Sequence, residues 1–228
     1  MPDYASPRTK WKLMAGPLLL QLLLGPAIVM IFFYAPVEAT MGQVQRIFYL
    51  HVGVAWCALA ACVAMGTCGA FYLFRRDLTF DHWSQAAAET GWLCSTLTLA
   101  TGSLWARQAW GVWWTWEPRL TSSLVLWFIY LGFIVVRAGL EEPQRRARIG
   151  AVFALVGLAD VPLILVATRW FRGVHPIAPE MDLRMRLTLV VAALSFTAFF
   201  GIVVYLRRLQ LMREEHCACL ESQQEVCG

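Results

Sequence analysis

Long apolar runs alternate with short polar segments along this chain. An α-helix rises about 1.5 Å per residue, so roughly 20 apolar residues cross the ~30 Å hydrocarbon core of a bilayer. Six runs approach or exceed this length, and they cover approximately residues 13–37, 48–74, 86–106, 121–136, 149–168 and 187–206. The pattern predicts an all-α integral membrane protein, a bundle of six transmembrane helices.

The polar segments between these runs are short, and no repeat or Pro/Ser-rich hinge separates a second unit. We therefore expect one membrane domain over residues 1–206, followed by a flexible tail over residues 207–228. Hydrophobic residues make up 59% of the 228 residues and charged residues only 15%, which is too few to cover a water-soluble globule of this size. An alternative for the first run is a cleaved signal peptide, because Val37-Glu38-Ala39 loosely fits a cleavage site.

The distribution of Lys and Arg predicts the orientation, since short positive loops stay on the cytoplasmic side. Twelve such residues precede the first run or follow the second, fourth and sixth, whereas the opposite side holds seven. Both termini are therefore expected in the cytoplasm. The net charge of +4 follows from the inner segments and requires no nucleic acid.

The segment between the third and fourth runs is rich in tryptophan. It reads WARQAWGVWWTWEPRLTS from Trp105 to Ser122 and holds five tryptophans. Charged residues at 107, 117 and 119 argue against burial in the bilayer core. We expect a platform at the outer membrane surface that suits a flat, apolar ligand with anionic groups at its edge. The alternative is a plain aromatic belt at the membrane interface.

Two of the four histidines are predicted on the same outer side as this segment. His51 lies a few residues into the second run, and His175 lies in the fifth connection. Two imidazoles can occupy both axial positions of haem iron, which leaves the porphyrin faces to pack on aromatic rings. Guanidinium groups suit the haem propionates. The outer arginines available for this are Arg107, Arg119, Arg172 and Arg184.

These histidines, tryptophans and arginines fit haem better than a bare metal ion, because no third metal ligand of comparable quality is evident. The alternative is that His51 is a hydrogen-bonded interfacial residue and His175 a loop residue without a special role. Asp160 lies near Pro162 in the fifth run, where an ionisable group is costly. It either has a function or is protonated and hydrogen-bonded to the backbone nearby. The sequence His216-Cys217-Ala218-Cys219 is interpreted as part of a reduced tail rather than as a metal site.

The sequence WGVWWTWEPRLTSSLVLWFIYLG resembles the tryptophan-rich signature of haem-handling proteins in cytochrome c maturation, and its continuation as RLTS is similar to the six-span CcmC family. The resemblance covers almost the whole chain. It implies that His51 and His175 are the two axial ligands of non-covalent haem b. The platform that it implies consists of Trp110, Gly111, Trp113, Trp114, Trp116, Glu117 and Arg119.

The resemblance also implies partners. Members of the family hold haem on the periplasmic side and load it onto a membrane-anchored haem chaperone, which passes it to apocytochrome c. The other partners implied are a small single-span subunit and the ATPase and permease subunits of an ABC transporter. Three positions depart from the family pattern: Glu117 stands where Asp is common, Pro176 replaces a polar residue after His175, and Asp160 stands where an amide is familiar.

The sequence has no G-x-x-x-x-G-K-[ST] loop and no C-x-x-C-H motif, so we expect neither an ATPase of its own nor covalent haem. We expect a haem-binding and haem-delivery protein rather than an enzyme. One alternative is a cytochrome b-like membrane oxidoreductase, which usually needs histidine pairs at two depths. Another is a solute transporter that uses Asp160 as a proton relay.

Overall fold

The computed structural model of this chain describes residues 21–170 and 181–227. In these two ranges the regular elements are helices, and the only β pairing is an isolated bridge between Glu38 and Gly42. The apolar helix Gln21–Tyr34 ends in the π-helical turn η1 (Met30–Tyr34). It is followed by α2 (Gln45–Arg75), α3 (Leu78–Trp110), α4 (Pro118–Ala138), α5 (Pro143–Trp170) and α6 (Leu183–Cys227). The predicted all-α class is confirmed.

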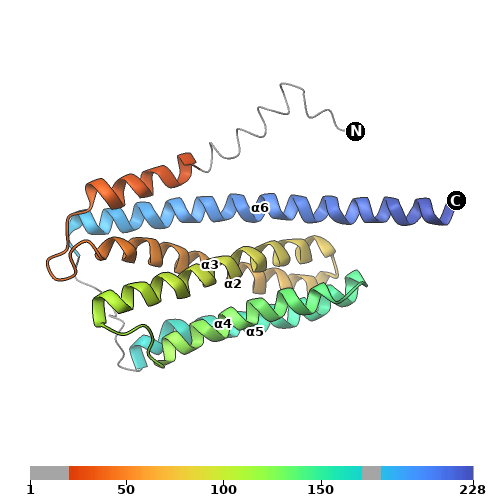
Figure 1. The fold of residues 1–228 in the computed structure, drawn as a ribbon. Helices are drawn as coiled ribbons and strands as arrows, with labels where there is room; N and C mark the ends of the chain where they lie inside the picture. Colours follow the sequence, from red (N-terminus) through yellow and green to blue (C-terminus); the bar gives the residue numbers. More distant parts are fainter. Residues whose placement is uncertain (1–20, 171–180, 228) are drawn as a thin grey trace, which may run out of the picture.

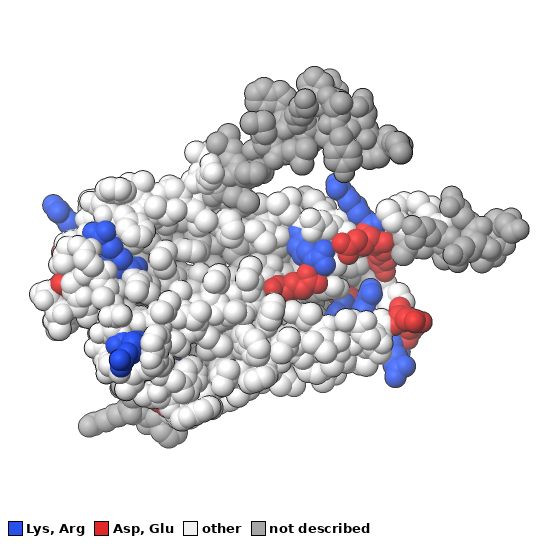
Figure 2. All heavy atoms as spheres, viewed as in Figure 1, with Lys and Arg blue, Asp and Glu red and all other residues white. Residues whose placement is uncertain are grey.

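Among the described residues, four helices are long and apolar enough to cross a membrane: α2, α4, α5 over Pro143–Ala167, and α6 over Leu183–Cys217. Helix Gln21–Tyr34 is apolar but shorter, and the preceding part of the predicted first run lies outside the described residues. Helix α3 has 33 residues but carries Asp81 and Glu89 and many Ser, Thr and Gly residues, so length and composition alone do not mark it as a span. Figure 2 shows charged side chains gathered toward the two ends of the molecule, with an uncharged surface between them.

The helix ends follow local sequence signals. Arg76 adopts a left-handed conformation (φ 58°) that ends α2, and the Asp77 carboxylate accepts a hydrogen bond of 2.8 Å from the Thr79 amide at the start of α3. This bond holds the pKa of Asp77 below its ordinary value. At the other end of α3, Gly111 has a φ of +75°, which favours glycine, and Pro118 occupies the first turn of α4.

The sequence after Leu206 is helical where a flexible tail was expected, since α6 continues to Cys227. This part of the chain is rich in Leu, Arg, Gln and Glu, which favour helix. Its first turns are also held to the bundle, because Arg207 contacts Glu89 of α3 at 2.5 Å. Arg207 also contacts Glu214 within α6 at 3.1 Å.

The core lies where α2, α3 and α5 meet (Figure 1). Small side chains dominate it, which lets the helix backbones approach closely. Its fully buried members include Ala61, Cys62 and Met65 of α2, Ala86, Ala87 and Ala88 of α3, and Ala154 of α5. Tyr130 of α4 completes this layer, and its hydroxyl donates a 2.7 Å hydrogen bond to the carbonyl oxygen of Ala58.

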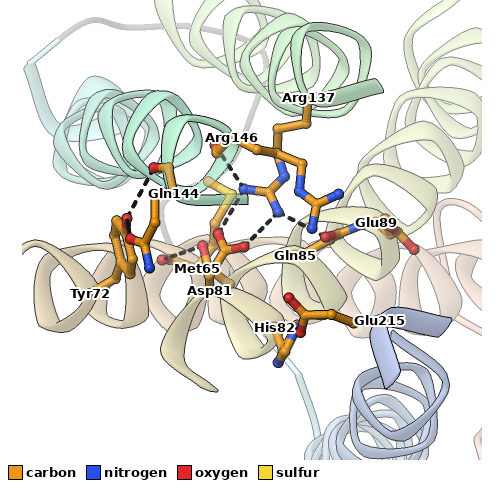
Figure 3. Close-up of polar contacts among 11 residues, drawn as sticks. Met65, Tyr72, Asp81, His82, Gln85, Glu89, Arg137, Gln144, Arg146 and Glu215 are labelled. Atoms are coloured by element: carbon orange, nitrogen blue, oxygen red, sulfur yellow. Dashed lines mark hydrogen bonds and ion pairs between the residues drawn. The ribbon is translucent and has the colours of Figure 1, made fainter. Parts of the chain in front are cut away.

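Polar contacts join the helices at the end of the bundle where α3 begins (Figure 3). Arg137 of α4 donates to both carboxylate oxygens of Asp81, at 2.7 and 2.8 Å, and to Gln85 at 2.8 Å. His82 Nε2 lies 2.8 Å from a Glu215 carboxylate oxygen on α6. The opposite end carries the start of α2 and the segment between α3 and α4 (Figure 1). Because α2 and α3 run in opposite directions, His51 near the start of α2 and the tryptophan segment after α3 lie at the same end of the bundle.

Candidate functional site

An open cavity lies beside His51 and the tryptophan segment, and the space between its walls, open solvent included, is about 750 Å³. Small and apolar side chains of α2, α3 and α4 form most of its wall, and Ile164 of α5 contributes at one side. Four predicted site residues from three separate parts of the chain line it: His51, Trp113, Trp114 and Arg119.

The His51 ring is held against one turn of α3. Its Nδ1 atom lies 3.1 Å from Thr101 Oγ1, and the ring stacks on Trp105 with centroids 6.4 Å apart and an interplanar angle of 25°. Gly102 leaves room for the ring edge, because a Cβ atom at that position would lie 2.9 Å from His51 Cε1. These contacts place the imidazole at the cavity wall.

A glycine turn directs the tryptophan segment. Gly111 ends α3, and its amide donates to the Arg107 carbonyl oxygen at 3.1 Å. The Arg107 side chain donates a hydrogen bond to the Gly111 carbonyl oxygen, and its Cζ atom lies 5.9 Å from the centroid of the Trp113 ring. A Cβ atom in this left-handed conformation is disfavoured, so glycine suits the turn. Gly111 therefore shapes the segment without lining the cavity.

The tryptophans of the segment have different surroundings. Trp110 packs on Trp105, with ring centroids 4.9 Å apart. Trp113 and Trp114 line the cavity. Trp116 is 76% exposed and meets Trp114 edge to face at 5.8 Å. The predicted platform is thus divided: Trp113 and Trp114 line the cavity, Trp110 packs on Trp105, and Trp116 lies outside the lining, while Trp113 and Trp116 are both exposed.

Trp114 also has an unsatisfied donor. Its Nε1 atom is buried and has no hydrogen-bond partner in the described parts of the chain. A buried N–H without an acceptor costs about 1–3 kcal/mol. A ligand that brings an acceptor oxygen to this atom would remove that cost.

Arg119 is the only charged side chain among the described residues that line the cavity. It lies in the first turn of α4, where the helix dipole is positive. A cation there is unfavourable unless a negative group lies nearby. Glu117, the residue before the helix, does not line the cavity, but its carboxylate interacts electrostatically with Arg119 and offsets part of this charge. The guanidinium at the cavity wall can still pair with an anionic group of a ligand.

These residues fit a haem. The cavity offers an imidazole, two indole faces, a guanidinium and an indole N–H that lacks an acceptor. The second predicted ligand, His175, lies outside the described residues, as does Arg172. The sequence interpretation missed Thr101 and Gly102, although the spacing of Thr101 and Trp105 by four residues puts them on one helix face.

The other candidate groups lie elsewhere. Asp160 of α5 is 7% exposed, and its Oδ2 atom has no hydrogen-bond partner among the residues described. It does not line the cavity. Cys217 is a free, exposed thiol, and no group of three His, Cys, Asp or Glu residues in the described ranges has the spacing of a metal site.

The sequence is similar to known proteins over almost its whole length. The model of the CcmC family, described as heme exporter protein C, matches residues 3–222. A heme exporter protein C from Rhodobacter capsulatus is 30% identical over 213 residues, which is 90% of this chain and 88% of the relative. A ccmC-like mitochondrial protein of cytochrome c biosynthesis from Marchantia polymorpha is 30% identical over 192 residues, 82% of each chain.

The heme exporter protein C of Escherichia coli K12 is 29% identical over 184 residues, 80% of this chain and 74% of the relative. The family match covers nearly the whole chain, including the tryptophan segment and the cavity. The chain belongs to the CcmC family of heme exporter protein C.

Proposed function

We propose that this protein binds haem in the cavity beside His51 and delivers it to a haem chaperone during the maturation of c-type cytochromes. The observation that carries the proposal is that the cavity joins His51 from α2, Trp113 and Trp114 from the connecting segment, and Arg119 from α4. The names of the family and of the relatives support haem handling in cytochrome c biogenesis.

Each side chain has a defined part in this proposal. His51 and His175 would hold the iron of the haem. Trp113 and Trp114 would pack on the porphyrin, and Arg119 and Trp114 Nε1 would pair with its propionates. The cavity lining extends from His51 to Leu59 along α2, about 12 Å at the helical rise, and its small and apolar side chains would accommodate apolar parts of the porphyrin. The protein binds and orients haem b non-covalently, and the iron chemistry is that of the haem.

We place this site at the periplasmic face of the bacterial inner membrane, with both termini in the cytoplasm. The excess of Lys and Arg at the opposite end supports this orientation. We also propose that α3 and the first predicted run span the bilayer together with the four apolar helices, as a single membrane domain. The partners proposed are a membrane-anchored haem chaperone, a small single-span subunit and an ABC transporter pair.

Absorbance spectroscopy of the purified protein tests haem binding. The wild-type protein should carry haem with the spectrum of a six-coordinate, bis-histidine iron. His51→Ala and His175→Ala should each convert it to a five-coordinate spectrum, and the double variant should lose the haem. His216→Ala is the control, because His216 is exposed and lies on α6, away from the cavity. An unchanged spectrum in the double variant would refute the proposed ligands.

Delivery is tested by co-expression with a membrane-anchored periplasmic haem chaperone. The wild-type protein should co-purify with the chaperone in a haem-dependent manner, and Trp114→Ala should weaken this association. Association that is equally strong without haem would argue against delivery through this site. Rapid reduction of the bound haem by a quinol analogue would instead favour the cytochrome b-like alternative.

A further inference from the structure

The hydrogen bonds of Thr101 determine which nitrogen of His51 carries the proton. Thr101 Oγ1 lies 2.7 Å from the Leu97 carbonyl oxygen and 3.1 Å from His51 Nδ1. A carbonyl oxygen only accepts, so the single hydroxyl proton of Thr101 points to Leu97. The Thr101 oxygen can then only accept from His51. The Nδ1 atom must therefore carry a hydrogen, and in the neutral ring the lone pair is on Nε2.

We propose that Thr101 is a positioning residue that holds His51 in the Nδ1–H tautomer and thereby directs Nε2 to the iron. The inference rests on the proposed function in one respect, namely that His51 binds the iron. A metal-bound histidine commonly donates its other ring N–H to an oxygen, which fixes the tautomer and raises the basicity of the ligand. Here the acceptor is a hydroxyl that is itself polarised by its bond to Leu97.

The rest of the α3 turn restricts the orientation of the ring. Trp105, one turn after Thr101, stacks on the imidazole, and Gly102 allows the Cε1 edge to approach the α3 backbone. Stacking alone would allow the ring to flip by 180°, which exchanges Nδ1 with Cδ2 and Nε2 with Cε1. The Thr101 hydroxyl disfavours this flip, because its oxygen would lose the Nδ1–H donor and face a ring carbon instead.

The tautomer can be measured without haem. In ¹⁵N NMR of the full-length protein with labelled histidine, protonated and unprotonated ring nitrogens have well-separated chemical shifts, and His51→Ala assigns the signal. The apo wild type, at a pH where the ring is neutral, should show a protonated Nδ1 and an unprotonated Nε2. Thr101→Val removes the acceptor and should give a mixture of tautomers, while Thr101→Ser should restore the wild-type state. A protonated Nε2 in the wild type would overturn the proposal.

Haem affinity is the second readout. Loss of a hydrogen-bond partner of a ligand typically weakens metal binding by about 10- to 100-fold. Thr101→Val should show a loss of this size and Thr101→Ser little loss. Equal losses in both variants, or no loss in Thr101→Val, would contradict a positioning role. Circular dichroism and gel filtration establish that each variant folds.

Thr197→Val is the matched control. Thr197 of α6 also donates to the carbonyl oxygen four residues earlier, at 2.6 Å, and accepts from a ring N–H, that of Trp56, at 2.9 Å. It does not line the cavity. Its replacement should leave both the His51 tautomer and the haem affinity unchanged, and an equal effect of both substitutions would show a general loss of packing instead. If the tautomer is as proposed but His51→Ala leaves haem binding intact, the ligand assignment fails while the tautomer assignment stands.

Discussion

Arg137 of α4 and Asp81 of α3 form a bidentate ion pair with N–O distances of 2.7 and 2.8 Å, and each side chain is only 4% exposed. The pair (Figure 3) joins the start of α3 to the end of α4, whereas the cavity lies beside the end of α3 and the start of α4. Two buried charges are stable only with good mutual geometry and further hydrogen bonds. Gln85 and the Arg146 carbonyl oxygen provide these bonds to the guanidinium, at 2.8 and 3.1 Å. The pair therefore connects α3 to α4 where each meets α5.

Replacement of one partner should destabilise the protein strongly. Asp81→Asn leaves the Arg137 charge buried without its counter-ion, and we expect a loss of about 3–5 kcal/mol. Chemical unfolding in detergent, followed by circular dichroism, measures the change. Glu142→Gln is the comparison: Glu142 and Arg148 are about half exposed and 3.9 Å apart, and such a pair contributes at most about 1 kcal/mol. Equal effects of the two substitutions would contradict the structural role of the buried pair.

Gly102→Ala should weaken haem binding while the helix itself is retained. The added Cβ atom would lie 2.9 Å from His51 Cε1, so the ring must move away from α3 and out of line with the iron. Displacement of a metal ligand typically reduces affinity by about tenfold or more. Haem titration of the apo protein measures this. Gly201→Ala of α6 is the control, because a Cβ atom there meets nothing within 4 Å, and it should bind haem like the wild type.

Trp114→Phe should reduce haem affinity through the loss of one hydrogen bond. The ring face is retained, but the donor to a propionate is lost, and a hydrogen bond to a charged group contributes about 1.5–3 kcal/mol. Haem titration should therefore show at least a roughly tenfold weaker affinity. Trp92→Phe removes a buried indole N–H that also lacks a partner among the described residues, and Trp92 does not line the cavity. A similar loss of affinity in Trp92→Phe would rule out a specific contact from Trp114.

The start of α3 should respond to acid through Asp77. Its carboxylate accepts a hydrogen bond from the Thr79 amide, and its pKa is lowered from the ordinary value of 3.8. A group whose pKa is lower in the folded state stabilises that state fully when the pH is above the pKa of the unfolded state. The stabilisation is lost as the pH falls through the pKa of the folded state. The difference in melting temperature between wild type and Asp77→Ala should thus be largest near neutral pH and shrink below about pH 3.8. A difference that does not change with pH would contradict a contribution from the charge.

The lengths and order of the apolar runs allowed the helices to be predicted, because length and hydrophobicity are local properties of a chain. The predicted runs 86–106 and 121–136 did not reach the facing ends of α3 and α4, which lie at the left-handed Gly111 and at Pro118. Short connections that lie on alternate sides of the membrane then predicted His51 and the tryptophan segment at the same end of the bundle. The continuation of α6 to Cys227 was not predicted, because hydropathy identifies membrane-spanning helices and does not identify polar ones.

Only the tertiary structure decided which side chains meet. The sequence treated Trp110, Trp113, Trp114 and Trp116 as one platform, whereas their contacts depend on how α3 and α4 are rotated and on the turn at Gly111. The contacts of Thr101 with His51 and of Asp81 with Arg137 join residues 50 and 56 positions apart. Such pairs arise from helix rotation and close packing at small residues, which no local pattern of hydrophobicity encodes.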